Sequence, residues 1–81
     1  MVTKNHLATE VTQRTVETLL KEVSEQSRNY ERALKKLLRG KPGTEAYDGN
    51  LGRVWAEAEV LATKAEHAKM AIDEYGDAVP D

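Results

Sequence analysis

The sequence predicts an all-α fold, an antiparallel hairpin of two helices packed along a coiled-coil-like seam. Three observations support this prediction. Apolar residues recur at alternating spacings of four and three in both halves of the 81-residue chain, as in helices that share a seam. A short stretch rich in glycine separates the halves, and alanine, the best helix former, is abundant in the second half. Residues 1–81 are therefore predicted to form a single helical-hairpin domain.

The first helix is predicted over about residues 8–39. Five threonines within the first 18 residues weaken the helical propensity there, so we expect residues 1–7 to be disordered and 8–15 to be helical but frayed. Its stripe has Ser27 as the one polar member and otherwise consists of Val16, Leu20, Val23, Tyr30, Leu34 and Leu37.

The turn is predicted at residues 40–43. Gly40 suits a left-handed helix cap, Pro42 blocks continuation of the first helix, and Thr44 suits the N-cap of the second. Asn50 is an alternative N-cap, which would leave a nine-residue loop. We favour the start at Thr44, because the apolar stripe then crosses the glycine-bearing segment without losing phase.

The second helix is predicted over about residues 44–75. Gly49 and Gly52 fall on its outer face, and Gly76 is expected to end it, leaving 76–81 as a frayed tail. Its stripe is Tyr47, Leu51, Val54, Ala58, Leu61, Ala65, Ala68, Ile72 and Tyr75. We expect the large members of this stripe to pack against the first helix, namely Tyr47, Leu51, Val54, Leu61 and Ile72.

No catalytic, cofactor-binding or metal-binding pattern is present, so the sequence predicts a protein without enzymatic activity or cofactors. The chain has no cysteine, and neither His6 nor His67 has a second ligand at metal-binding spacing. Ser24 and Ser27 have no neighbouring base. The net charge is −2 and no apolar run suggests a signal peptide or a membrane span, which favours a cytoplasmic protein.

The second helix carries more apolar residues than one seam can cover. At about 100° per residue, several of them project to its back and sides. These are the candidate partner-binding residues, Trp55, Val60, Met70 and Ala56. Trp and Met are enriched at interfaces, although scattered exposed apolar residues are also normal. The expected partner is either a second copy, which would form a four-helix bundle, or a different protein.

A basic stripe follows the outside of the first helix at spacings of four, three and four. It consists of Arg28, Arg32, Lys35 and Arg39. Three interpretations stay open: a solvated face that complements the helix C-terminus, a contact with an acidic partner protein, and a contact with nucleic-acid phosphates. Nucleic acid is the least favoured, because no aromatic residue interleaves the stripe and the chain as a whole is acidic.

Residues 33–77, "ALKKLLRGKPGTEAYDGNLGRVWAEAEVLATKAEHAKMAIDEYGD", resemble the small E-type co-chaperones of bacterial type III secretion needles. In both, a basic leucine-bearing helix ends near a glycine turn, and a tyrosine, an alanine-rich helix and a short acidic tail follow. The matching residues are Arg39-Gly40, Tyr47, Ala58, Ala65, Ile72, Tyr75 and Gly76-Asp77.

This resemblance implies a cytoplasmic hairpin that binds a tetratricopeptide-like co-chaperone. The pair would hold the needle subunit and prevent its premature polymerisation. One rival hypothesis is a homodimeric four-helix bundle that binds RNA or has a regulatory role. Another is a needle or filament subunit, but the paired-proline turn typical of needle subunits is missing, since "GKPGT" has one proline.

Overall fold

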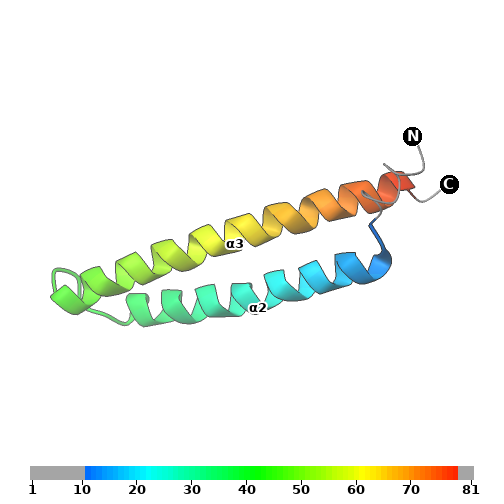
Figure 1. Cartoon of the computed structure of the whole chain (residues 1–81). Helices are drawn as coiled ribbons and strands as arrows, with labels where there is room; N and C mark the ends of the chain where they lie inside the picture. The colour runs from blue at the N-terminus through cyan, green and yellow to red at the C-terminus, as the bar shows by residue number, and fades with distance from the viewer. Residues whose placement is uncertain (1–10, 79–81) are drawn as a thin grey trace.

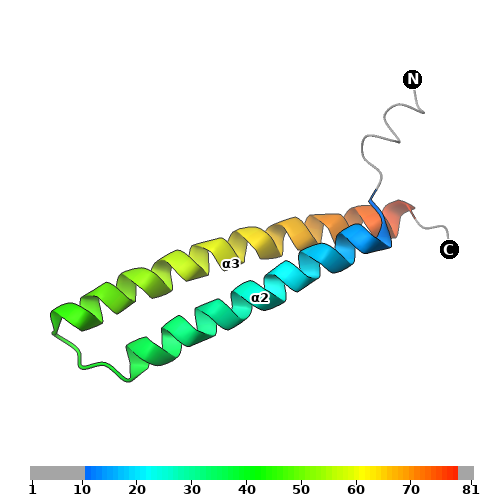
Figure 2. The same cartoon turned by 60° about the horizontal axis from the view of Figure 1, so that its bottom comes forward.

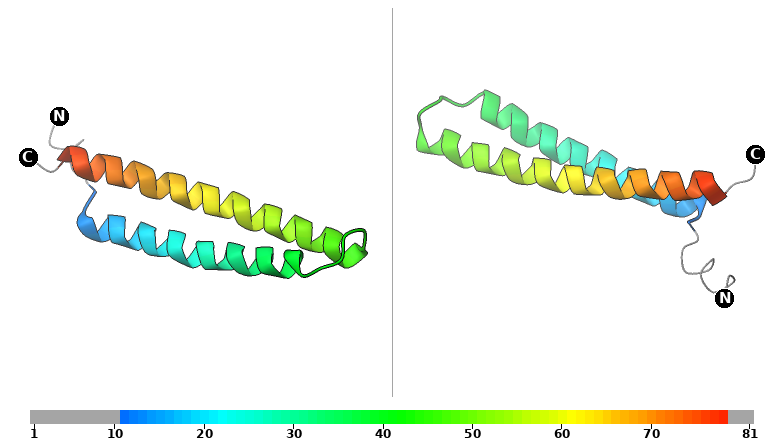
Figure 3. Two further views of the ribbon diagram at one scale, coloured as in Figure 1. Left: turned by 180° about the vertical axis from the view of Figure 1, so that it is seen from behind. Right: turned by 90° about the horizontal axis from the view of Figure 1, so that it is seen from above.

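Two antiparallel helices make up the fold, as predicted. The computed structural model describes residues 11–78, and within them α2 spans Gln13–Leu38 and α3 spans Glu45–Ala78. The helices lie side by side, and the described chain starts and finishes at the end opposite the turn (Figures 1 and 2). Figure 3 shows the same pairing from two further directions. The predicted disorder of residues 1–7 lies outside the described residues.

α2 begins later than the sequence predicts. Thr12 is extended and acts as the N-cap, and its hydroxyl oxygen accepts a hydrogen bond from the Thr15 N–H at 3.2 Å. Residues 11 and 12 are therefore not helical, which corrects the predicted start near residue 8. Thr12 has a weak helical propensity, but it defines the start of the helix, since a Thr side chain can accept a hydrogen bond from a free N–H there.

α3 starts early, which excludes the alternative start at Asn50. Thr44 caps it as predicted, because its Oγ1 accepts a hydrogen bond from the Tyr47 N–H at 3.2 Å. Glu45 and Asp48 lie in the first turn, where the helix dipole favours negative charge. At the other end, Gly76 does not end the helix, which continues to Ala78, so the predicted tail at 76–78 is wrong.

The left-handed residue of the turn is Gly43, with φ of 89°, and the prediction for Gly40 is wrong. α2 instead closes through Arg39, whose N–H bonds to the Lys35 carbonyl at 3.2 Å, and through Gly40, whose N–H bonds to the Leu37 carbonyl at 2.9 Å. A Cβ at Gly40 would lie 3.3 Å from Tyr47 Cδ2. The absence of a side chain at Gly40 therefore allows the Tyr47 ring to pack close to the backbone there.

The seam between the helices is rotated relative to the predicted stripes. Gln26 fixes the register, because its Nε2 donates to the backbone oxygen of Glu57 at 3.1 Å and to Glu57 Oε1 at 2.6 Å. The seam residues, all buried or half-buried, are Val16, Leu19, Val23, Gln26, Tyr30, Ala33 and Leu37 of α2 and Tyr47, Asn50, Val54, Glu57, Leu61, Lys64, Ala68, Ala71 and Tyr75 of α3.

Three of the seven residues of the α2 stripe and four of the nine of the α3 stripe therefore lie outside the seam. Leu51 and Ile72, predicted to pack against the first helix, are 46% and 45% exposed. Leu20 and Ser27 of the α2 stripe are also exposed. The physical reason is that polar side chains take the alternate seam positions, where Gln26 and Glu57 bond to each other.

The hairpin has a small core of its own. Among the described residues, the buried apolar side chains are three alanines and one leucine, Ala33, Ala68, Ala71 and Leu37. None of the larger side chains described is fully buried. Such a core supplies little hydrophobic stabilisation, so the isolated hairpin is expected to be marginally stable.

Two glycine substitutions test the backbone assignment. Gly52→Ala is expected to stabilise the protein by up to about 1 kcal/mol, because Gly52 is helical and a Cβ there meets nothing within 4 Å. Gly43→Ala is expected to destabilise it by about 1 kcal/mol or more, because φ of 89° disfavours a Cβ. Urea unfolding followed by circular dichroism measures both, and equal effects of the same sign would contradict the assignment.

Candidate functional site

The hairpin has two unlike sides, one on each flank of the seam. In an antiparallel pair, the positions that flank the seam on one helix adjoin the equivalent flanking positions of the other. The sides are therefore continuous surfaces contributed by both helices. One is polar and grooved, and the other is apolar.

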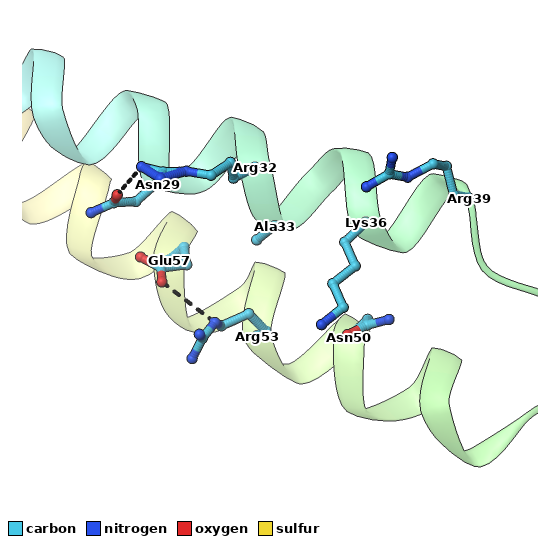
Figure 4. Close-up of a pocket in the computed structure, with 8 residues that line it drawn as sticks. All are labelled: Asn29, Arg32, Ala33, Lys36, Arg39, Asn50, Arg53 and Glu57. Carbon is cyan, nitrogen blue, oxygen red and sulfur yellow. Dashed lines mark hydrogen bonds and ion pairs between the residues drawn. The ribbon is translucent and has the colours of Figure 1, made fainter.

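The grooved side carries a cavity of about 480 Å³ near the turn (Figure 4). Its walls combine basic side chains from both helices with amides and one carboxylate. They are Asn29, Arg32, Ala33, Lys36 and Arg39 of α2 and Asn50, Arg53 and Glu57 of α3. We call this cavity the basic groove.

Hydrogen bonds and one ion pair hold part of the basic groove in place. Arg32 Nη2 donates to Asn29 Oδ1 at 2.8 Å, and Arg53 Nε lies 3.6 Å from Glu57 Oε2. Glu57 thus meets both Arg53 and Gln26, which leaves four cationic side chains in the groove against one carboxylate that already has two partners. The groove is positively charged.

The structure divides the predicted basic stripe. Arg32 and Arg39 line the basic groove, whereas Arg28 lies on the back of α2 and donates to Ser24 at 3.2 Å. Lys35 is exposed. Lys36, which neighbours the predicted stripe, and Arg53, which the sequence did not associate with it, also line the basic groove. Arg53 lies on the other helix, so only the register between helices reveals that it joins α2's cations.

The other side is apolar over almost the whole length of the hairpin. Its largest exposed side chains are Trp55, Leu51, Ile72 and Leu20, at 67%, 46%, 45% and 44% exposure. Small residues separate them along α3. We call this surface the apolar face and define it as Leu20, Ser27 and Leu34 of α2 with Leu51, Trp55, Ala58, Ala62, Ala65 and Ile72 of α3.

The candidate partner-binding residues do not share one surface. Trp55 belongs to the apolar face, whereas Val60 is on the grooved side, where it lines a second hollow with Glu22 and His67. Ala56 and Met70 are exposed on the outer side of α3. Of the four, the structure therefore groups only Trp55 with the other large exposed side chains.

The apolar face explains why the predicted stripes differ from the seam. Each stripe contains alternate seam residues, such as Val23 and Leu61, and alternate apolar-face residues, such as Leu20 and Ala65. The apolar stripe of each helix is thus oriented partly toward the other helix of the hairpin and partly toward the apolar face. Helices in four-helix bundles are apolar in this direction, because each packs against two neighbours at once.

Gln26 offers a test of the polar seam. Gln26→Ala removes both hydrogen bonds to Glu57 and is expected to destabilise the hairpin by about 1–2 kcal/mol. The control is Glu25→Ala at the preceding, exposed position, with an expected change below about 0.5 kcal/mol. Urea unfolding compares the two, and equal effects would contradict the assignment of Gln26 to the seam.

Comparisons of this chain with protein-family models, curated proteins and solved structures find no match. Over residues 11–78, no group of three or more potential metal-ligating side chains is present. In the same range, neither helix is long and apolar enough to cross a membrane.

Proposed function

We propose that this protein is a non-enzymatic, protein-binding co-chaperone of type III secretion. With a tetratricopeptide-like partner, it would hold a needle subunit unpolymerised in the cytoplasm. The observation that supports the proposal is the apolar face, because a hairpin with a core of three alanines and one leucine leaves its larger apolar side chains to be covered by another protein.

The shape of the apolar face suits amphipathic helices. On α3, the large side chains of this face are Leu51, Trp55 and Ile72, and the face residues between Trp55 and Ile72 are Ala58, Ala62 and Ala65. Small residues let a second helix approach closely, and the larger ones provide anchors at the ends of the contact. A needle subunit's amphipathic helix would be covered in this way and kept from pairing with other needle subunits.

The experiment is a reconstitution with the needle subunit and the tetratricopeptide protein encoded in the same secretion system. The proposal predicts a soluble three-protein complex on a sizing column and a needle subunit that stays unpolymerised in a sedimentation assay. Polymerisation at an unchanged rate, with no complex formed, would overturn it. Polymerisation of the chain itself would instead support the needle-subunit alternative.

The basic groove supports a second candidate, a bundle that binds RNA. Its four cations form a positive surface on the side opposite the apolar face, so both surfaces are available together. The expected result for this candidate is RNA binding that falls steeply with salt and is lost when Arg32 and Lys36 are changed to Glu. Lys41→Glu, outside the groove, is the control.

A further inference from the structure

We infer that the apolar face binds a second copy of this chain, giving an antiparallel four-helix bundle in which α2 packs on α2 and α3 on α3 with the turns at opposite ends. The inference concerns the chain alone and holds whether or not the proposed function does. It rests on the spacing of residues within the apolar face, on one charge pair and on the size of the face.

The α2 part of the apolar face is symmetric about Ser27. Leu20 and Leu34 lie seven residues before and after it. A two-fold axis at Ser27 therefore sets Leu20 of each copy opposite Leu34 of the other, and Ser27 opposite itself. This is the self-matching that an interface between identical subunits requires. It also accounts for the polar residue in an otherwise apolar stripe, since a small side chain lies where the two copies come closest.

The α3 part of the face is matched about Ala58. An axis there sets Leu51 opposite Ala65 and Trp55 opposite Ala62 of the other copy, so these two large side chains each meet a small one. Ile72 lies beyond this part, at the level of Thr44 of the other copy. Interlocking of large and small residues is how helices pack at close distance. The sequence thus provides space on each copy for the large side chains of its partner.

One axis serves both helices. Gln26 contacts Glu57, and Ser27 and Ala58 follow these two residues directly in the chain, so they lie within about one helical turn of each other along the hairpin. A rigid two-fold dimer requires the two centres to lie at similar heights, and Ser27 and Ala58 meet this requirement.

Charges at the margin of the face agree with the same axis. Asp48 and Lys69 flank the apolar face on α3, both exposed, at nearly equal distances on either side of Ala58. The axis therefore brings Asp48 of each copy next to Lys69 of the other, twice per dimer. On α2, the same axis sets Glu31 opposite the uncharged Ser24 and Glu17 opposite Leu38.

The face is large enough for a stable dimer. α2 has 26 residues and the hairpin is 22 Å across its second dimension, so the hairpin side that carries the face has a projected footprint of about 800 Å² per copy. Specific interfaces of standard size bury about 800 Å² on each partner. A dimer with both turns at the same end would pack less evenly, because Leu34 and Leu51 of both copies would lie at one level. Leu20 and Ala65 would lie together at the opposite end, on the other side of Ser27 and Ala58.

Cysteine cross-linking tests the axis directly, because the chain has no cysteine of its own. Ser27→Cys places one thiol per copy at the axis, and mild oxidation is expected to convert most of the protein to a disulfide-linked dimer. Ser24→Cys is the matched control, since it lies on the same helix but opposite Glu31 rather than itself. It is expected to cross-link at least tenfold more slowly.

The pairing of Asp48 with Lys69 of the other copy provides a second test. Sedimentation equilibrium measures the dimer dissociation constant. Asp48→Lys is expected to weaken dimerisation roughly tenfold at low salt, and adding Lys69→Asp is expected to restore it. Retained helicity confirms that each variant folds. The inference is overturned by a wild-type chain that stays monomeric, by equal cross-linking at Ser24 and Ser27, or by failure of the second charge change to rescue the first.

Discussion

Leu37→Ala is expected to destabilise the hairpin by about 2–4 kcal/mol, the largest stability effect of any single truncation here. Leu37 is 6% exposed and is the only large apolar side chain among the described residues that is buried. Its loss removes the transfer free energy of the buried side chain and leaves a cavity at that position. Because a hairpin of this size has only a few kcal/mol of stability, much of the variant is expected to be unfolded at 25 °C.

Leu38→Ala is the matched control, since it makes the same chemical change one residue later at a position that is 71% exposed. Its expected effect is below about 0.5 kcal/mol. Urea unfolding of both variants, followed by circular dichroism, gives the two free energies. Similar losses in Leu37→Ala and Leu38→Ala would contradict the packing of α2 on α3 described above.

Trp55→Ala is expected to have the largest effect on partner binding, a loss of about 2 kcal/mol or more. The corresponding fall in affinity is roughly 30-fold. Trp55 is the largest side chain of the apolar face and is 67% exposed in the single chain, so a partner that covers the face buries a large apolar area there. Calorimetric titration with the needle subunit and its tetratricopeptide co-chaperone measures the change.

Met70→Ala tests whether the apolar face, rather than the outer side of α3, contacts the partner. Met70 is 53% exposed but lies away from the apolar face, so its truncation is expected to change the affinity less than threefold. Both variants are expected to keep the helicity of the wild type. Wild-type affinity in Trp55→Ala, or an equal loss of affinity in Met70→Ala, would contradict the proposal that the partner binds the apolar face.

The sequence predicted the elements well because their signals are local. Thr44 caps α3 by a hydrogen bond within its own first turn, and the phase of the apolar residues favoured this start over one at Asn50. The start of α2 and the left-handed glycine were predicted wrongly for a related reason. Other threonines near Thr12 could also cap a helix, and Gly40 could adopt a left-handed conformation as readily as Gly43. Only the backbone conformation shows that Thr12 is the N-cap and Gly43 the left-handed residue.

The seam was less predictable, because it depends on contacts between helices. The apolar pattern placed Leu51 and Ile72 against α2, but their neighbours Asn50 and Ala71 lie between the helices instead. Glu57 and Lys64 likewise lie in the seam in place of Ala58 and Ala65. A stripe shows in which direction a helix is apolar and not which neighbour lies there. The basic groove was missed in the same way, since Arg53 joins Lys36 only through the register that Gln26 and Glu57 set.

The central claim is that the apolar face binds a second copy of this chain. The fluorescence of Trp55, measured together with the molar mass, tests this claim most directly. Trp55 is the only tryptophan in the chain and lies on the apolar face, so its emission reports on the burial of that face alone. With increasing concentration, we predict that the mass rises from 9.0 kDa to twice that value and that the emission shifts to the blue over the same range. A doubled mass with unchanged emission would contradict the claim, as would a 9.0 kDa species at every concentration.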